Sequence, residues 1–389
     1  MSTEAQEEVV MSGPPTPILS DYMELGSLVL LFAAGGPVNL VAYSQLSERR
    51  RAGRGEPTTE MLKRHLNYSD LLVMFVYVPG RAFWLVCYDW RAGRLLCKLF
   101  KFLHALGLLL SANVVVCIAL ERLLAVLPVG RNQFRRRRMG LVSVVVAWCA
   151  AVAASAPQLL VWDTFEGWPG WSQCVSVWQK ALHEDFVLRQ SSFGNDSHGS
   201  LIAANDSFSR AERLMTAGRL YAAFHVFMAF WLPATVIVIC YLTIVTCIHR
   251  SSRLARHRQD VSIDLSQSAA SVDGSLLETV EDNKWWRGLN NPRASRQSRQ
   301  ATSFGVSSTS STGGEPAIYR TVERRRRVAV RFSWLIVVAY LVCWFPYNAM
   351  QLWQLLDEST ARQSDSFYAL YAIVLFSSVL NPFLYSMVF

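Results

Sequence analysis

Seven long apolar runs follow one another along this chain, and each is interrupted by one or two polar or helix-breaking residues. A membrane-spanning helix needs roughly 20 mostly apolar residues, and every run is long enough to provide one. Ionisable residues are costly inside a bilayer, which makes the interruptions candidates for function. The runs cover residues 23–46, 65–88, 97–126, 139–161, 218–248, 327–354 and 367–388. The pattern predicts an all-α membrane protein, with an N-terminal segment at 1–22 and a seven-transmembrane helix bundle at 23–388.

Composition and charge agree with a membrane protein and indicate its orientation. Hydrophobic residues make up 52% of the chain and charged residues only 17%, which is too apolar for a surface that faces water throughout. The net charge of +9 could indicate nucleic-acid binding, but the basic clusters Arg49–Arg51, Arg135–Arg138 and Arg324–Arg327 flank apolar runs on one side. Such clusters mark the cytoplasmic face, so we expect an extracellular N-terminus and a cytoplasmic C-terminus. The acidic segment 1–22 does not resemble a signal peptide, so the first run is expected to direct insertion.

Two long connections carry most of the remaining polarity. Residues 162–217 are predicted to form an extracellular loop, where Asn195 and Asn205 each begin an N-glycosylation sequon. Residues 249–325 are predicted to form a long disordered cytoplasmic loop, because they lack apolar periodicity and are rich in Ser, Arg, Gln and Asp. Of the cysteines, Cys87, Cys97 and Cys174 lie toward the oxidising side. A Cys97–Cys174 disulfide would pin the loop 162–217 over the bundle, with Cys87 as a competing partner or a spare thiol.

The interrupting residues recur in a recognisable order. They are Asn39 in the first run; Leu66, Asp70 and Pro79 in the second; Ser111 and Glu121-Arg122-Leu123 in the third; Trp148 and Pro157 in the fourth; Pro233 and Tyr241 in the fifth; Cys343-Trp344-Phe345-Pro346-Tyr347 in the sixth; and Asn381-Pro382-Phe383-Leu384-Tyr385 in the seventh. This joint order and spacing resembles that of class A (rhodopsin-like) G-protein-coupled receptors. An enzyme is not indicated, since no metal-ligand spacing, nucleophile elbow or phosphate loop is present.

The resemblance implies roles for these residues. Asp70, Ser111 and Asn381 would form a mid-membrane pocket for an allosteric sodium ion, with no other cofactor; the alternative is a polar network that only ties helices together. An activation switch would comprise Glu121, Arg122, Tyr241, Trp344, Pro346, Pro382 and Tyr385. In it, the two prolines would bend helices, and Arg122 would leave Glu121 to meet a heterotrimeric G protein. The loop at 249–325 is where we expect an arrestin to engage.

Several residues depart from the family pattern. Leu123 replaces the usual aromatic residue after the arginine, and Arg326 stands where many relatives place an acid that locks Arg122. We therefore expect a weakened inactive-state lock and some basal activity. Tyr340 stands where phenylalanine is usual, and Ala112 where a larger aliphatic residue is usual, so the core is expected to be repacked.

The ligand is predicted to be a short peptide. An aminergic receptor needs an acid at the position of His104, and an opsin needs a lysine at that of Leu375. The sixth run, with Asn348, Gln351 and Trp353 after its proline motif, resembles the gonadotropin-releasing-hormone, adipokinetic-hormone, corazonin and vasopressin/oxytocin receptors. The segment 171–175 resembles the gonadotropin-releasing-hormone branch, whereas Lys101, Gln158 and Gln351 resemble the vasopressin branch.

The expected ligand cavity mixes amides, cations and aromatic rings, which suits a small amidated peptide with few charges. Its residues would be Arg81, Lys101, His104, Gln158, Phe224, Tyr347, Asn348, Gln351, Tyr368 and Tyr371. We predict a plasma-membrane receptor for a neuropeptide of the gonadotropin-releasing-hormone/adipokinetic-hormone type, signalling through Gq and calcium. The alternatives are a vasopressin/oxytocin-like receptor, a non-signalling decoy receptor, or a transporter.

Overall fold

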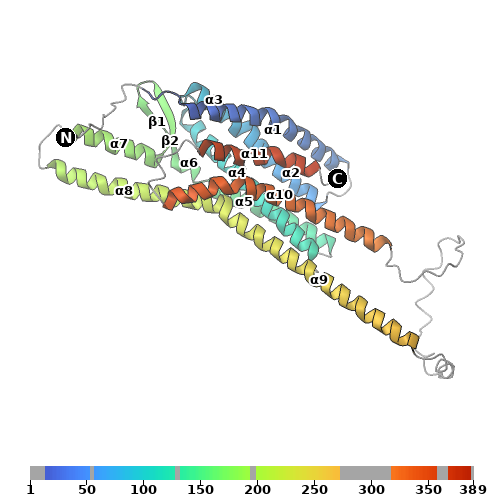
Figure 1. Ribbon diagram of the computed structural model, residues 1–389. Helices are drawn as coiled ribbons and strands as arrows, with labels where there is room; N and C mark the ends of the chain where they lie inside the picture. The colour runs from blue at the N-terminus through green and yellow to red at the C-terminus, as the bar shows by residue number, and fades with distance from the viewer. Residues whose placement is uncertain are drawn as a thin grey trace, which may run out of the picture. The chain divides into compact units, whose positions relative to one another are not determined.

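The computed structural model describes residues 14–52, 57–127, 132–192, 199–271, 317–356 and 367–386. Two compact units are present, one formed by Met1–Ile244 with Val328–Phe389 and the other by Val245–Arg327. The first unit contains the helix bundle and both strands (Figure 1). The second contains the end of one long helix and the beginning of the next.

Helices account for almost all of the described chain. In order, the elements are α1 (Leu19–Arg51), α2 (Thr58–Leu72), the π-helical segment η1 (Val73–Tyr77), α3 (Val78–Cys87), α4 (Gly93–Val126), α5 (Gln133–Ser155), α6 (Gln158–Val161), β1 (Trp162–Trp168), β2 (Trp171–Ser176), α7 (Val177–Ser192), α8 (Gly199–Val226), the π-helical segment η3 (Phe227–Trp231), α9 (Leu232–Ser271), α10 (Ala317–Leu356) and α11 (Phe367–Ser386).

Within the described ranges, six helical stretches are long and apolar enough to cross a membrane. They are Leu19–Arg51, Thr58–Cys87, Gly93–Val126, Gln133–Val161, Glu212–Arg250 and Trp334–Leu356, and the shorter apolar helix Leu370–Leu384 follows them. The predicted bundle of seven transmembrane helices is therefore confirmed, although the helices begin and end several residues away from the expected boundaries. The chain is a multi-pass membrane protein.

The two long connections contain regular structure. The segment 162–217, predicted as an extracellular loop, forms the hairpin β1–β2, then α7 and the first part of α8. The expectation of disorder at 249–325 is wrong for 249–271 and 317–325, which are helical parts of α9 and α10. Of the two sequons, Asn205 lies in α8 and Asn195 lies outside the described residues.

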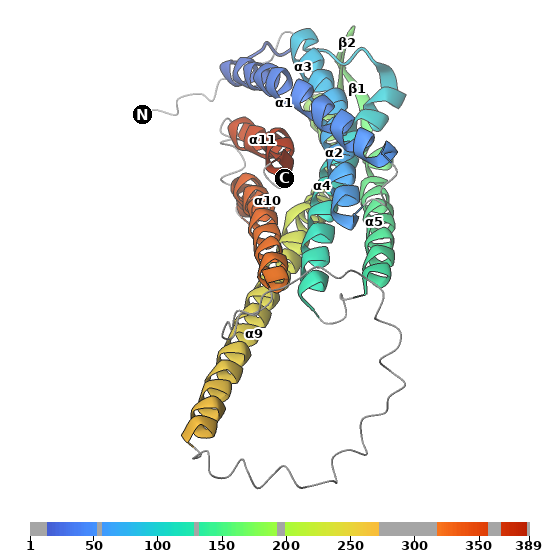
Figure 2. The ribbon, with the colours of Figure 1, turned by 90° about the vertical axis from the view of Figure 1, so that its right-hand side faces the viewer.

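Some polar side chains are buried and many large apolar ones are exposed, unlike in a water-soluble protein. Asp70 and Asn39 are fully buried at 0% exposure, whereas Leu30 on α1 is 72% exposed and Leu242 on α9 is 61% exposed. Apolar side chains facing outward and polar ones facing inward are expected of a helix bundle surrounded by lipid. The bundle packs α2 and α5 against α4, and α11 against α1, as both ribbon views show (Figure 2).

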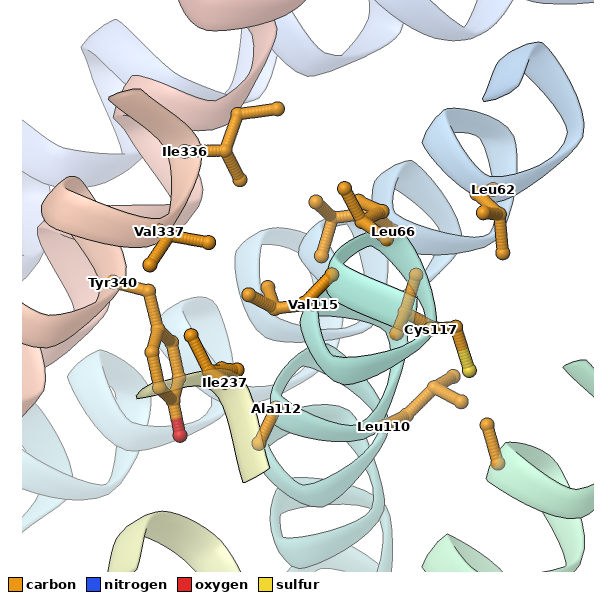
Figure 3. Close-up of a cluster of buried hydrophobic side chains, with 14 of the residues drawn as sticks. Leu62, Leu66, Leu110, Ala112, Val115, Cys117, Ile237, Ile336, Val337 and Tyr340 are labelled. Atoms are coloured by element: carbon orange, nitrogen blue, oxygen red, sulfur yellow. The ribbon is translucent and has the colours of Figure 1, made fainter. Parts of the chain in front are cut away.

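A large buried apolar cluster occupies the middle of the bundle and joins α2, α4, α5, α9 and α10 (Figure 3). Leu66, Leu110 and Ile237 are among its fully buried members, and Tyr340 lies alongside Ile237 (Figure 3). Close packing is stringent nearby at Gly35 of α1, where an added Cβ would lie 2.8 Å from the Met74 Sδ. An added methyl group would require the Met74 side chain to move, so glycine at this position favours the close approach of α1 to η1.

Candidate functional site

One end of the bundle, called here the hairpin end, is covered by β1 and β2. The strands are antiparallel, with Thr164 opposite Cys174, and Gly170 at φ 76° forms the turn between them. A disulfide joins Cys174 to Cys97 in the first turns of α4, while Cys87 is a free thiol. The hairpin is therefore covalently held over the helices that bear the predicted ligand residues.

The short connection between α3 and α4 also anchors the hairpin. The Asp89 carboxylate accepts a hydrogen bond from the Ser172 backbone N–H at 2.9 Å and an ion pair from Arg91 at 2.9 Å. The Ser172 backbone bond is the main reason that the pKa of Asp89 lies below its ordinary value, although burial opposes the shift. Tyr88, in the left-handed conformation at φ 51°, presents its carbonyl to the Trp171 indole N–H at 2.8 Å.

Two cations lie beneath the hairpin. The Arg81 guanidinium forms a bidentate ion pair with Glu24 of α1, with both N–O distances at 2.8 Å. The Lys101 ammonium lies 3.8 Å from the Trp162 ring centroid and 5.1 Å from that of Trp84, within cation–π range of both. The sequence identified both cations but missed Glu24, which neutralises the charge of Arg81.

Beside these cations, an aromatic cluster lines the bundle interior. The His104 ring stacks on Tyr77 with centroids 3.8 Å apart, and its Nε2 is hydrogen-bonded to the Tyr371 hydroxyl. Tyr371 in turn lies 5.1 Å from Tyr347, measured between ring centroids. Three of the predicted ligand residues, His104, Tyr347 and Tyr371, are thus brought together by α4, α10 and α11.

A second polar group joins α6 to α8. The Gln158 amide contacts His225 Nε2 at 3.0 Å, and its carbonyl accepts from the Trp162 indole N–H. The neighbouring Phe224 is 43% exposed, and its ring is perpendicular to that of His225, 6.1 Å away between centroids. On this helix, His225 occupies the inward position that was expected of Phe224.

The remaining predicted ligand residues lie on α10 and α11. Asn348 is buried and its amide donates to the Trp344 carbonyl at 2.8 Å, so it is bonded within its own helix. Gln351 lies one turn beyond, half-buried. Tyr368 belongs to α11, but its side chain lies outside the described part of the chain.

A cavity of about 220 Å³ opens at the hairpin end. It lies between the start of α1, the end of α3 and the hairpin, and is lined by Pro15, Asp21, Arg81, Trp84, Leu85, Tyr88, Trp171 and Gln173. Two indole rings, a guanidinium, a carboxylate and one amide side chain are among the groups that line it, which gives a ligand both apolar area and hydrogen-bond partners.

Halfway through the bundle, Asp70 and Asn381 meet. The Asn381 amide donates to both carboxylate oxygens of Asp70, at 3.0 and 3.1 Å, and both residues are buried. Ser111 is also buried, on α4 beside α2. Carboxylate, amide and hydroxyl oxygens suit a hard cation such as sodium, and the sodium pocket stays a prediction.

At the opposite end, Glu121 is shared by two arginines. Its carboxylate lies 3.4 Å from Arg122 on α4 and 3.7 Å from Arg136 on α5. Arg136 is held there because Asn132 caps α5, accepting hydrogen bonds from the Phe134 and Arg135 backbone amides. Sequence reasoning found the Glu121–Arg122 pair but missed Arg136.

The other predicted switch residues lie on α9, α10 and α11. Tyr241 is buried and stacks on Trp334, with centroids 5.0 Å apart. The Trp344 indole donates to the Ser377 hydroxyl at 3.2 Å, which connects α10 to α11. Pro346 and Pro382 lie inside α10 and α11, and each removes a backbone donor from its helix. Tyr385 lies near the end of α11, with its side chain outside the described part.

Comparisons with known proteins agree with this geometry. Residues 39–194 and 206–385 match the family described as 7 transmembrane receptor (rhodopsin family). The G-protein coupled receptor daf-38 of Caenorhabditis elegans is 36% identical over 402 residues, covering 96% of this chain and 90% of that protein. The gonadotropin-releasing hormone II receptor of Callithrix jacchus is 24% identical, covering 97% of this chain and 78% of that receptor. The human vasopressin V1b receptor is also 24% identical, with 93% and 72% covered.

Proposed function

Because the chain belongs to the rhodopsin family of seven-transmembrane receptors, we propose that it is a plasma-membrane receptor for a short, amidated neuropeptide. The peptide would be of the gonadotropin-releasing-hormone/adipokinetic-hormone type and would enter at the hairpin end, on the extracellular side. The chain is a G-protein-coupled receptor and not an enzyme.

The observation that carries the proposal is the position of Lys101. Its ammonium lies between the indoles of Trp162 in β1 and Trp84 in α3, directly beneath the disulfide-held hairpin. An ammonium donates hydrogen bonds to peptide carbonyls, and the indoles supply aromatic faces for apolar side chains. Both features match a peptide better than a small monoamine.

The charges near Lys101 favour a ligand with few charges. Glu24 neutralises Arg81, so an additional ligand carboxylate is not required to compensate that arginine. A C-terminal amide keeps the hydrogen-bonding capacity of a peptide end without its negative charge. The Gln158–His225 pair and the tyrosines beside His104 provide further donors, acceptors and ring faces.

Signalling would follow from a shift between two arrangements of the bundle. A peptide that binds one arrangement more tightly displaces the equilibrium toward it by its differential affinity. We propose that the favoured arrangement releases Arg122 from Glu121 and admits a G protein of the Gq class, with calcium release as the readout. The G-protein class is an analogy to the peptide-receptor branch.

The test is a screen of synthetic amidated neuropeptides by calcium response in transfected cells, with surface expression measured in parallel. We expect at least one amidated peptide to evoke a response and its free-acid form to be weaker. Lys101→Met should reduce potency about ten-fold or more, since a charged hydrogen bond typically contributes about 1.5–3 kcal/mol. Lys98→Met is the matched control, because Lys98 lies on the same helix and donates instead to the Leu159 carbonyl at 3.0 Å. Silence of a surface-expressed receptor across the amidated peptides would contradict the proposal.

Two other functions are tested by the same cells. A vasopressin/oxytocin-like receptor is favoured by Lys101 and Gln158, and it would respond to peptides of that class instead. A decoy receptor would bind labelled peptide without any second-messenger change. Arg122→Ala separates these cases, since loss of coupling with retained surface binding identifies a signalling receptor.

A further inference from the structure

Tyr340 of α10 makes a hydrogen bond that phenylalanine could not make. Its hydroxyl donates to the backbone carbonyl of Ala229, at an O–O distance of 3.0 Å. Ala229 belongs to η3, the π-helical segment between α8 and α9. The bond therefore connects α10 to the helix that precedes it in the bundle.

The backbone around Ala229 departs from a regular α-helix. At the end of η3, the Leu232 amide N–H donates to the Phe227 carbonyl, five residues earlier instead of four. Proline has no amide hydrogen, so Pro233 supplies no backbone donor to this turn. The Tyr340 hydroxyl supplies a donor to the Ala229 carbonyl from the neighbouring helix.

The surroundings hold the Tyr340 ring in place for this bond. Tyr340 is only 3% exposed, and its ring centroid lies 6.1 Å from that of Phe230 in η3 and 5.1 Å from that of Trp344 in α10. Ala112 is a fully buried member of the same cluster, and its small side chain occupies little of that space (Figure 3). Because Trp344 donates to Ser377, the Tyr340 ring is packed against a residue that is itself tied to α11.

Together with the Glu121–Arg122 pair, this bond would characterise the resting arrangement of the receptor. In the same structure, Arg122 remains paired with Glu121 at 3.4 Å, which is the pairing that signalling is proposed to break. Movement of α10 away from η3 would separate the Tyr340 hydroxyl from the Ala229 carbonyl. The moving helix would then leave that carbonyl without the tyrosine donor.

We propose that Tyr340 is a positioning residue that holds α10 against η3 through this hydrogen bond and so favours the resting receptor. The proposal rests on the signalling function proposed above. A single neutral hydrogen bond shifts an equilibrium by roughly five-fold, so its loss should raise the small signalling population by about that factor.

The test compares Tyr340→Phe with the native receptor, each purified and reconstituted with G protein, without any peptide. Basal nucleotide exchange per receptor is expected to rise roughly five-fold. Replacement of Tyr340 by 4-fluorophenylalanine, which is similar in size but cannot donate, should give the same rise if Tyr340→Phe folds poorly. Tyr43→Phe is the matched control, since Tyr43 lies on α1 and is 42% exposed. If the native receptor catalyses nucleotide exchange, unchanged or lowered basal exchange in the Tyr340 variants would overturn the proposal.

A second measurement distinguishes a hydrogen bond from simple packing. Pro233→Ala supplies an amide N–H that competes for the Ala229 carbonyl, so Tyr340→Phe should have a much smaller effect in that background. If Tyr340 acted only through ring packing, its replacement would have the same effect with proline or alanine at position 233. An equal effect in both backgrounds therefore overturns the proposal.

A third measurement does not depend on coupling to a G protein. Spin labels at positions 127 on the α4 side and 329 on α10 report the distance between these helices. Tyr340→Phe is expected to enlarge the long-distance population roughly five-fold. A shifted distance without any nucleotide exchange would leave the Tyr340 inference intact while contradicting the proposed signalling function. An unchanged distance distribution would overturn the inference itself.

Discussion

Breaking the ion pair between Glu24 and Arg81 should be one of the more destabilising single changes at the hairpin end. Both N–O distances are 2.8 Å, and the side chains are only 7% and 19% exposed. Opposite charges about 4 Å apart attract by about 4 kcal/mol at an effective dielectric constant of 20. Removing one partner of a buried pair typically costs about 3–5 kcal/mol, because the other charge is left uncompensated.

Glu24→Gln is the chosen perturbation because it keeps the size of the side chain and removes only the charge. We expect it to lower the free energy of unfolding by about 3 kcal/mol, the lower end of the range, since the residual exposure of Arg81 lets water screen part of the charge. Titration of the purified receptor with a denaturing detergent in mixed micelles measures this difference. Arg81→Gln should cost a similar amount, and the double variant should be less destabilised than the sum of the two.

A matched control is available at the same end of the bundle. Arg94 and Asp163 also form an ion pair at 2.8 Å, but Arg94 is 66% exposed. Arg94→Gln should therefore cost less than about 1 kcal/mol. The reasoning is refuted if Glu24→Gln costs no more than Arg94→Gln, or if the Glu24 and Arg81 substitutions are simply additive.

Three further predictions follow from other parts of the structure. Asp89→Asn should destabilise the receptor at pH 7 but not in acid. The pKa of Asp89 is depressed in the folded protein, so its carboxylate stabilises the fold fully above the unfolded pKa of about 3.9. This stabilisation is lost as the pH falls through the folded pKa. Thermal unfolding of both proteins between pH 7 and pH 3 checks this, and a stability difference that stays constant with pH contradicts it. Asp70→Asn should abolish any effect of sodium concentration on peptide potency, measured in potassium-balanced buffers; a retained sodium effect would place the ion elsewhere. Arg136→Gln should lower basal nucleotide exchange about two-fold, on the scale of an exposed ion pair, because Glu121 is then left to Arg122 alone; a rise in basal exchange would contradict this role.

Much of the bundle could be predicted from the sequence because lipid imposes a strict rule on each helix. A residue such as Asp70 in an apolar run must face the interior, and the structure buries it at 0% exposure beside Asn381. The same rule locates the helices but not their ends, since a helix continues beyond the bilayer wherever its polar residues allow. The polar segments 199–217 and 249–271 lack apolar periodicity and are nevertheless helical. A helix without an apolar stripe can still form, although it has no apolar face to pack against its neighbours.

The sequence predicted the ligand site less completely than the helices, and the reason is geometric. Neighbouring residues on a helix point about 100° apart, so a one-residue ambiguity decides which side chain faces inward. On α8 that ambiguity separated Phe224 from His225, which reaches Gln158. Glu24 lies at the edge of the first run, where an acidic residue is easily assigned to the flanking polar segment. Only the folded structure places it against Arg81. Its pairing partner is 57 residues away in the chain, beyond any local pattern.

The proposed Tyr340 bond also bears on the basal activity expected from Arg326. At 1.5 Å per residue, position 326 lies about 30 Å along α10 from the bend at Pro346, and Tyr340 lies about 9 Å from it. A contact at position 326 therefore has the longer lever arm. A hydrogen bond is lost when it stretches by about 1 Å, which corresponds to a tilt of about 2° at the longer lever arm and about 6° at the shorter one. A helix restrained through Tyr340 can therefore make larger excursions before the bond breaks. We expect the resting state to be broader for this reason, with Trp344, one turn from Tyr340, able to transmit ligand binding to the same bond.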